Sequence, residues 1–271
     1  MRNTWGPAAM LALFFCAAAG ALVAQVAAQS PAAPEWAQPG SATHTQVAPP
    51  ADFHRPSKNF TTPIGIFEGQ SDIGAALVPG SASYDAGAKR YTINSAGYNV
   101  WYVRDEFRYL WKKVSGDVSL AADVAFPDPN GYDDRKAVLV IRQNLEDDSK
   151  QAVVSLHGAG MISLAQRTEK SARMTDLEYR MGSRGGRPGG ASPDTLVTVK
   201  AQRIGIEKRG DKFALFVSLD GEEMHQFGAP VTLHLDGPFY VGIGFCSHLP
   251  DKSDTAVLSN VVLENAAGKV R

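Results

Sequence analysis

The stretch RKAVLVIRQNLEDDSKQAVVSLHGAGMISLAQR, residues 135–167, is the most informative part of this chain for its fold. It holds three mainly apolar runs, 136–144, 151–157 and 160–167, joined by short polar or glycine-containing segments. Runs of this length with turn residues between them are typical of consecutive β-strands. The first run is apolar on both faces, as expected of a central strand that is covered front and back. We therefore expect three neighbouring strands of one sheet.

Polar side chains stand at the ends of these strands and suggest a groove along the sheet. Arg142 and His157 lie at the ends of the first two strands, and Gln166 lies near the end of the third. Their side chains can form hydrogen bonds with a ligand, so we take these three residues as candidate contacts. The alternatives are a buried, carboxylate-paired arginine at position 142 and an ordinary strand-end histidine at position 157.

Strand patterns of the same kind continue along most of the chain. The expected strands are 64–68, 90–94, 98–103, 107–114, 117–126, 136–144, 151–157, 160–167, 195–199, 202–208, 212–219, 231–235, 238–247 and 255–264. Gly, Asp, Asn and Pro bound many of them, and no helical stripe long enough for a core helix follows the N-terminal apolar run. Short strands with turn signals between them predict an all-β fold, a two-sheet antiparallel jelly-roll sandwich.

The N-terminal residues predict export. Arg2 precedes an unbroken apolar run over residues 8–24, and small residues follow it, which is the pattern of a cleavable signal peptide over residues 1–28. An uncleaved membrane anchor is the alternative, because a run of this length is at the lower limit for crossing a bilayer. Export would place the protein in the periplasm or outside the cell.

The segment after the signal differs in composition from the rest. Residues 29–60 contain six prolines among Ala, Gln, Ser and Thr. Such a segment cannot bury enough apolar surface to offset its ordering entropy, so we expect a flexible tether here and one sandwich domain over residues 61–271. The glycine-rich stretch Gly182–Pro193 is expected to form a loop that interrupts the sheet.

Charge and cysteine content narrow the partners. The formal net charge of the chain is −1, and it becomes about −2 without residues 1–28, whose one charged side chain is Arg2. Neither nucleic acid nor an anionic membrane surface is favoured by so small a charge, and a membrane partner would require an uncleaved signal. Cys246 is then the one cysteine left, so no internal disulfide can form, and we expect it to be buried.

Four blocks of the sequence resemble a group of bacterial concanavalin A-like sandwich domains whose function is largely uncharacterised. The blocks are DEFRYLWKKVSGDVSLAADVAF (105–126), RKAVLVIRQ (135–143), RIGIEKRGDKFALFVSLDGEE (203–223) and GPFYVGIGFCSH (237–248). Domains of this group occur alone or fused behind propellers in proteins described as Tol-type biopolymer transport components. The resemblance implies a jelly roll whose concave face, in better-known relatives, holds carbohydrate, with Arg142 and His157 pointing toward that face.

An aromatic ring is another route to sugar binding, because ring faces stack on the C–H faces of pyranoses. Trp101 is the candidate, since the polar residues Asn99, Arg104 and Asp105 around it suggest an accessible strand end. The alternative is a core residue, as for most aromatic side chains of a sandwich.

No catalytic motif is evident. Sandwich glucanases carry Glu-x-Asp-x-Glu on one strand, because alternate residues share a face and hold two carboxylates across a glycosidic bond. That triplet is absent. We expect that no carboxylate partner lies two or four residues away from any of four glutamates, Glu106, Glu146, Glu178 and Glu207. The residue types of a sandwich lyase, without a recognisable spacing, are supplied by Gln151, His157, Tyr179 and Arg142.

One loop has the composition of a cation site. Residues 128–134, DPNGYDD, bring several oxygen donors together, and Asp128, Asn130 and Asp133 are the candidate ligands for a hard cation such as Ca²⁺. The spacing is not that of an EF-hand, and such clusters are also ordinary turn chemistry. No pair of histidines has zinc-site spacing, and we expect no other cofactor.

The leading hypothesis is an exported, non-catalytic module that binds carbohydrate or polysaccharide on a concave sheet face, with Arg142, His157, Gln166 and Trp101 as contacts. The first alternative is a polysaccharide-active hydrolase or lyase, and the second is a structural domain tethered to an envelope protein partner. Carboxylates about 5–10 Å apart in a cleft would favour the hydrolase. A polar concave face with an exposed tryptophan would favour binding, and a flat apolar face would favour a protein partner.

Overall fold

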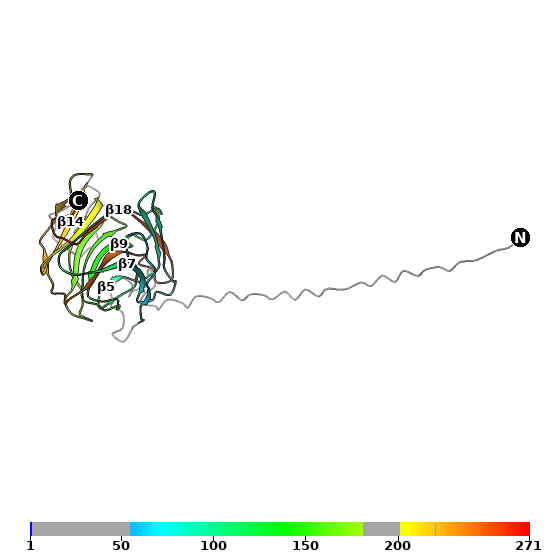
Figure 1. Ribbon diagram of the computed structural model, residues 1–271, viewed down its shortest axis with the longest axis horizontal. Coiled ribbons are helices and arrows are strands. Elements are labelled where there is room, and N and C mark those ends of the chain that lie inside the picture. The colour runs from blue at the N-terminus through cyan, green and yellow to red at the C-terminus, as the bar shows by residue number, and fades with distance from the viewer. Residues whose placement is uncertain (2–54, 181–200, 220) are drawn as a thin grey trace.

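The protein is a sandwich of two antiparallel sheets (Figure 1). The computed structural model describes Met1 and residues 55–180, 201–219 and 221–271. The predicted signal peptide, most of the predicted tether and the Gly182–Pro193 loop lie outside the described residues, as does the expected strand 195–199. In the part of the chain that the structure describes, no helix has the length and apolar character needed to cross a bilayer.

Each large sheet has eight strands. The first sheet, from edge to edge, consists of β1 (Lys58–Phe60), β2 (Gly69–Ile73), β7 (Phe107–Val114), β17 (Phe239–Cys246), β9 (Lys136–Arg142), β10 (Gln151–His157), β11 (Met161–Arg167) and β12 (Thr175–Arg180). The second sheet consists of β15 (His225–Gln226), β14 (Lys212–Leu219), β13 (Ala201–Arg209), β8 (Val118–Ala125), β18 (Asp254–Glu264), β4 (Arg90–Ser95) and β3 (Ser81–Asp85), with β16 (Val231–Thr232) beside β14. A separate hairpin is formed by β5 (Val100–Trp101) and β6 (Arg104–Asp105).

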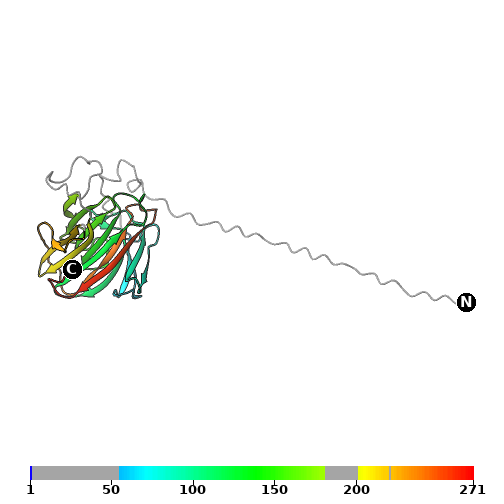
Figure 2. The ribbon, with the colours of Figure 1, turned by 90° about the horizontal axis from the view of Figure 1, so that it is seen from above.

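The C-terminal strands lie in the middle of both sheets. β17 lies between β7 and β9, and β18 lies between β8 and β4, all in antiparallel pairing. Figures 1 and 2 show these orange and red strands among green and cyan ones. Strands that are distant in the sequence are therefore neighbours in space, which is the arrangement of a jelly roll. The all-β, two-sheet jelly-roll sandwich predicted from the sequence is confirmed.

The expected strands agree with the structure where the sequence is apolar. The stretch 135–167 forms β9, β10 and β11 as three neighbours of the first sheet, as predicted. The strand expected over 64–68 is wrong, because only an isolated bridge between Ile64 and Phe67 occurs there. The strands missed by sequence analysis include β2, β3 and β12, whose polar sequences GQSDI, SASYD and TDLEYR hide them from an apolar-run search. The first sheet begins with β1, inside the segment interpreted as a tether.

Side chains between the two sheets form the main core. Leu139 and Ile141 of β9 face this layer, and Leu120 of β8 and Ile206 of β13 meet them from the second sheet, all without solvent exposure. Burial of each such side chain contributes roughly 1.5–3 kcal/mol. This layer fixes which residues of each strand of the first sheet face outward, because successive side chains alternate between faces.

The outer face of the first sheet is covered in part by residues 96–106, which contain the β5–β6 hairpin. Val138 and Val140, the outward residues of β9, belong to a second apolar cluster with Val100 of the hairpin. All seven residues of β9 are buried. The expectation of a strand covered front and back is therefore confirmed, and the hairpin is one of the covering elements.

Candidate functional site

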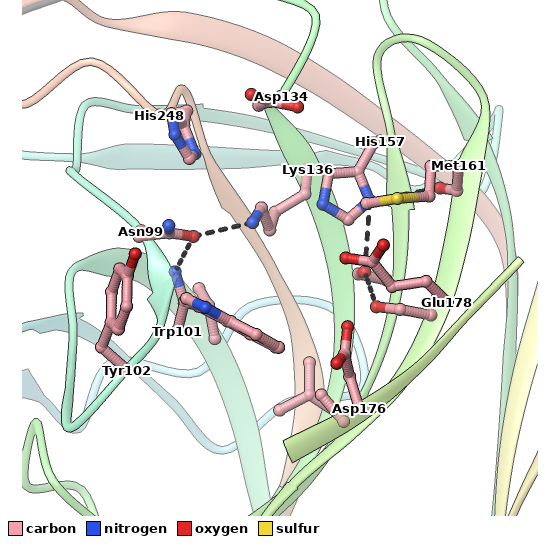
Figure 3. A pocket seen from close by; sticks show the side chains of 15 residues that line it. Asn99, Trp101, Tyr102, Asp134, Lys136, His157, Met161, Asp176, Glu178 and His248 are labelled. Atoms are coloured by element: carbon pink, nitrogen blue, oxygen red, sulfur yellow. Dashed lines mark hydrogen bonds between the residues drawn. The ribbon is translucent and has the colours of Figure 1, made fainter. Parts of the chain in front are cut away.

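A cavity of about 130 Å³ lies on the outer face of the first sheet, between β9–β12 and the β5–β6 hairpin (Figure 3). Two rows of cross-strand neighbours form its floor: Glu178, Ser163 and Ser155 in one, and Asp176, Ala165 and Val153 in the other. Side chains directly opposite one another on antiparallel strands have Cβ atoms about 4.5–5.5 Å apart. Because serine, alanine and valine are small, the floor is hollow beside the two carboxyl groups.

The wall opposite the carboxyl groups is the β5–β6 hairpin. Tyr102 begins its two-residue turn with a φ of 49°, a left-handed conformation that is uncommon for a residue other than glycine. The Tyr102 carbonyl accepts hydrogen bonds from Arg167 Nη2 at 3.2 Å and from the backbone N–H of Met174 at 3.0 Å. These two bonds hold the turn, and the turn places Trp101 and Tyr102 against the cavity.

Lys136 supplies a buried amine to the cavity. It is 6% exposed, and its Nζ donates a hydrogen bond of 2.7 Å to Asn99 Oδ1. Lys136 makes no ion pair with any carboxylate in the described residues, so two of its three N–H groups have no partner there. Burial lowers the pKa of Lys136 below its ordinary value, although nearby anionic groups oppose this shift.

Asn99 and Tyr102 add further donors. Asn99 is also 6% exposed, and its Oδ1 accepts bonds from Lys136 and from the Val100 N–H at 2.9 Å. Neither the Asn99 side-chain N–H₂ nor the Tyr102 hydroxyl bonds to any described residue, although both side chains line the cavity. Together with Lys136, they form a set of unused donors at one end of the cavity.

Two carboxyl groups form the other end. Asp176 and Glu178 are alternate residues of β12 and so share the outer face, where their side chains are in hydrogen-bond contact. Two carboxyl groups in contact must share a proton. Burial, with the charge of Glu178 next in importance, raises the pKa of Asp176 to about 7.

His157 lies between the two ends. Its Nδ1 lies 3.2 Å from the Met161 carbonyl oxygen and 3.4 Å from Ser155 Oγ, and Ser155 Oγ is 2.7 Å from Ser163 Oγ. The bond to the Met161 carbonyl requires a proton on Nδ1 and fixes the orientation of the ring. His157 and Lys136 are directly paired across β10 and β9, so both enter the cavity from the same level of the sheet.

Of the residues predicted as ligand contacts, Trp101 and His157 line the cavity. Trp101 is half-buried, its ring centroid is 6.4 Å from that of Tyr102, and its indole N–H bonds to no described residue. Gln166 lies in register with Ile162 and Leu164 of β11, which face the second sheet, so it is on the opposite face from the cavity.

Arg142 lies in a different group, the Asp105 cluster, which consists of Asp105, Arg142, Gln151 and Arg167, all with 0% exposure. Asp105 accepts hydrogen bonds from Arg167 at 2.8 and 2.9 Å, from Gln151 at 2.9 Å and from Arg142 at 3.3 Å. The Arg142 guanidinium also lies 5.6 Å from the centre of the Phe107 ring. This arrangement matches the alternative of a buried, carboxylate-paired arginine.

The residue types of a sandwich lyase are not brought together. Gln151 and Arg142 belong to the Asp105 cluster and His157 belongs to the cavity, whereas Tyr179 packs against the inter-sheet core. The expectation that Glu178 has no carboxylate partner two or four residues away is wrong, because Asp176 is that partner. It is also wrong for Glu146 and Glu207, which have Asp148 two residues away and Asp211 four residues away.

The loop predicted as a calcium site has the geometry of an Asx turn. Asp128 Oδ1 accepts a hydrogen bond of 2.8 Å from the Asn130 N–H, and the Asp128 carbonyl accepts one of 2.6 Å from Arg135 Nη2. Among the described residues, no three His, Cys, Asp or Glu side chains are grouped as a metal site. Calcium binding by Asp128, Asn130 and Asp133 stays a prediction.

The cavity residues that were not predicted as contacts include Tyr102, Asn99, Lys136, Asp176 and Glu178. The last two carry a usable signal, since Asp-x-Glu in a strand places both carboxyl groups on one face. The polar sequence TDLEYR of this segment does not itself predict a strand, so the signal is hidden. Asn99 and Lys136 are 37 positions apart and meet only through the fold.

No protein-family model and no curated protein matches the chain. Similar solved structures include a functionally unknown protein from Saccharomyces cerevisiae, with 13% identity and a TM-score of 0.47, covering 69% of this chain and 93% of that one. Another is the carbohydrate-binding module CBM66 from Bacillus subtilis, with 17% identity and a TM-score of 0.40, covering 69% of this chain and 92% of that one. A third is the alginate lyase from Klebsiella pneumoniae, with 11% identity and a TM-score of 0.42, covering 69% of this chain and 85% of that one. At TM-scores below 0.5 these likenesses carry no argument about function.

Proposed function

We propose that this protein is an exported, non-catalytic carbohydrate-binding protein and that the cavity holds one saccharide ring. The observation that carries the proposal is the set of unused donors on Lys136, Asn99 and Tyr102, which faces the acceptor pair on β12 across a single cavity. A sugar ring presents donors and acceptors around its edge, so it can complete both sets at once.

The size and the aromatic side chain of the cavity agree with such a ligand. A volume of about 130 Å³ is below the roughly 300–1,000 Å³ of sites for drug-sized ligands, which favours one ring or a chain end. The half-buried Trp101 beside the donors offers an apolar face for the C–H groups of that ring.

The carboxyl geometry favours binding over hydrolysis. Glycosidases hold their two carboxyl groups roughly 5–5.5 Å or 6.5–9.5 Å apart, so that a glycosidic bond or a water fits between them. Asp176 and Glu178 are in direct hydrogen-bond contact, which leaves no such space. As a pair they can accept hydrogen bonds from ring hydroxyls.

Exposed apolar side chains do not favour a protein partner. Apart from the terminal Met1, the large hydrophobic residues exposed in the described part of the chain are Phe60, Ile66 and Leu177. Leu177 lies on β12, at the opposite edge of the first sheet from β1 and Phe60. Leu177 and Phe60 are therefore far apart on the sheet, and single exposed hydrophobic residues are normal on a protein surface.

A glycan array probed with the full chain, followed by calorimetry on the ligand found, tests the proposal. Trp101→Ala should weaken binding about tenfold or more, since it removes the stacking ring. The matched control is Tyr240→Ala, which removes a half-buried aromatic of the first sheet that lies outside the cavity. Binding to no glycan, or equal affinities of the Trp101→Ala variant and the unmodified chain, would overturn the proposal.

A further inference from the structure

The donor end of the cavity carries the amine of Lys136, whose positive charge a neutral sugar does not compensate. Lys136 is a buried amine with a single hydrogen bond and no ion pair to a described carboxylate. A buried ammonium without a counter-ion is unfavourable, and a ligand that supplies one removes that cost. The unused N–H₂ of Asn99 is held next to Lys136 by their shared hydrogen bond.

We propose that the cavity prefers an acidic sugar, a uronate, whose carboxylate binds Lys136 Nζ and the side-chain N–H₂ of Asn99. This inference rests on the proposed function and names its ligand class. A carboxylate has two oxygens and accepts from both donors at once, and a charge-assisted hydrogen bond is about twice as strong as a neutral one. The sugar hydroxyls would then face Asp176 and Glu178.

The carboxyl groups at the far end do not exclude an anion while they share a proton. Asp176 and Glu178 lie on β12, three strands away from Lys136 on β9, a backbone separation of about 14 Å at the usual strand spacing. With one proton between them the pair carries a single negative charge. The carboxylate of the sugar would therefore lie next to its counter-ion, Lys136, and far from the negative charge of Asp176 and Glu178.

Binding should consequently depend on pH. The titratable groups that face Lys136 are Cys246 of β17, His157 of β10, Asp134 before β9, Asp176 and Glu178 of β12, and His248 and Tyr102 of the flanking loops. The Cys246 thiol stays neutral, because burial raises its pKa to about 12. As pH rises through about 7, Asp176 loses its proton, and the negative charge at that end of the cavity increases. The added negative charge disfavours an anion, and the lowered pKa of Lys136 acts in the same direction as pH rises further.

The test is calorimetry of the full chain with matched methyl glycosides: glucuronate against glucose, and galacturonate against galactose. At pH 6 one uronate should bind about tenfold more tightly than its neutral partner, and this preference should shrink by pH 8. Lys136→Met should reduce the preference to within about twofold while neutral-sugar binding changes less, since methionine keeps the shape of the buried chain. Lys113→Met, at an exposed lysine of β7, is the matched control and should leave the preference intact.

The outcomes separate this inference from the proposed function. Equal binding of uronates and neutral sugars, or a preference that survives Lys136→Met in a variant with an unchanged melting temperature, would overturn the uronate proposal alone. A preference that grows with pH would do the same. Failure of every sugar to bind at either pH would overturn both proposals.

Discussion

Two sets of charged residues, the Asp105 cluster and the lining of the cavity, lie on the same outer face of the first sheet. They differ in how their charges are compensated. In the Asp105 cluster the guanidinium groups of Arg142 and Arg167 share a carboxylate, and all members have 0% exposure. In the cavity Lys136 has no described carboxylate as an ion-pair partner, and it borders open space. Removing one partner of a compensated, enclosed charge destabilises the fold, whereas an uncompensated charge beside a cavity is available to a ligand.

The two groups are linked by the β5–β6 hairpin. Asp105 is the last residue of the hairpin, and Arg167 binds both Asp105 and the carbonyl of Tyr102. Trp101 and Tyr102, which the hairpin carries, line the cavity. The Asp105 cluster therefore acts as the support that positions one wall of the cavity.

The largest expected effect comes from breaking the Asp105 cluster. Asp105→Asn keeps the shape of the side chain but leaves two buried guanidinium groups without a counter-ion, which should lower the free energy of unfolding by roughly 3–5 kcal/mol. Guanidinium chloride denaturation measures this loss. Asp211→Asn, which changes an exposed hydrogen-bond contact with His234, should change stability by less than about 1 kcal/mol. Similar effects of the two substitutions would contradict the assignment of Asp105 as the structural centre.

A smaller effect separates support from ligand contact. Arg142→Met should lower the free energy of unfolding by about 1–3 kcal/mol, because Asp105 keeps the two bonds from Arg167 while the polar partners of Arg142 are left behind. Glycan affinity measured by calorimetry should stay within about twofold of that of the unmodified chain, because Arg142 does not line the cavity. A tenfold loss of affinity in the folded variant would restore Arg142 as a ligand contact, as the sequence suggested.

The sequence predicts the fold well because apolar periodicity reports burial directly. β7, β10 and β14 begin and end at the residues expected from their patterns. Edge and rim strands such as β3 and β12 contain mostly polar residues, and their pairing depends on neighbours that are distant in the sequence. Their strand character is therefore a result of the assembled sheet more than of local composition.

The candidate site is only partly visible in the sequence. The prediction of Trp101 and His157 as contacts rests on their strand-end positions, where an aromatic ring or a histidine is easily recognised in the sequence. The spacing of Gln166 from Ile162 and Leu164 places it on the core side of β11, so alternation along the strand argues against its prediction as a contact. Lys136 gives no such signal, since its burial arises from its contact with Asn99 on the covering segment.

The smallest expected effect concerns the pH dependence of stability. Because the folded-state pKa of Asp176 is raised to about 7, the native state holds a proton that the unfolded chain releases above about pH 4. The stability linked to this proton is fully present below about pH 4 and is lost as pH rises through 7. Asp176 is only partly buried, so after allowance for solvent screening the loss should be on the order of 1–2 kcal/mol.

Asp176→Asn should remove this loss, because an amide cannot ionise and still contacts Glu178. Urea denaturation from pH 4 to 8 should show the unmodified chain losing stability relative to the variant as pH rises, with Asp236→Asn, at an exposed carboxylate, as the matched control. Parallel curves for the Asp176→Asn variant and the unmodified chain would mean that Asp176 and Glu178 do not share a proton. The cavity would then carry both negative charges already at pH 6, and the contrast between a compensated cluster and a ligand-ready cavity would have to rest on Lys136 alone.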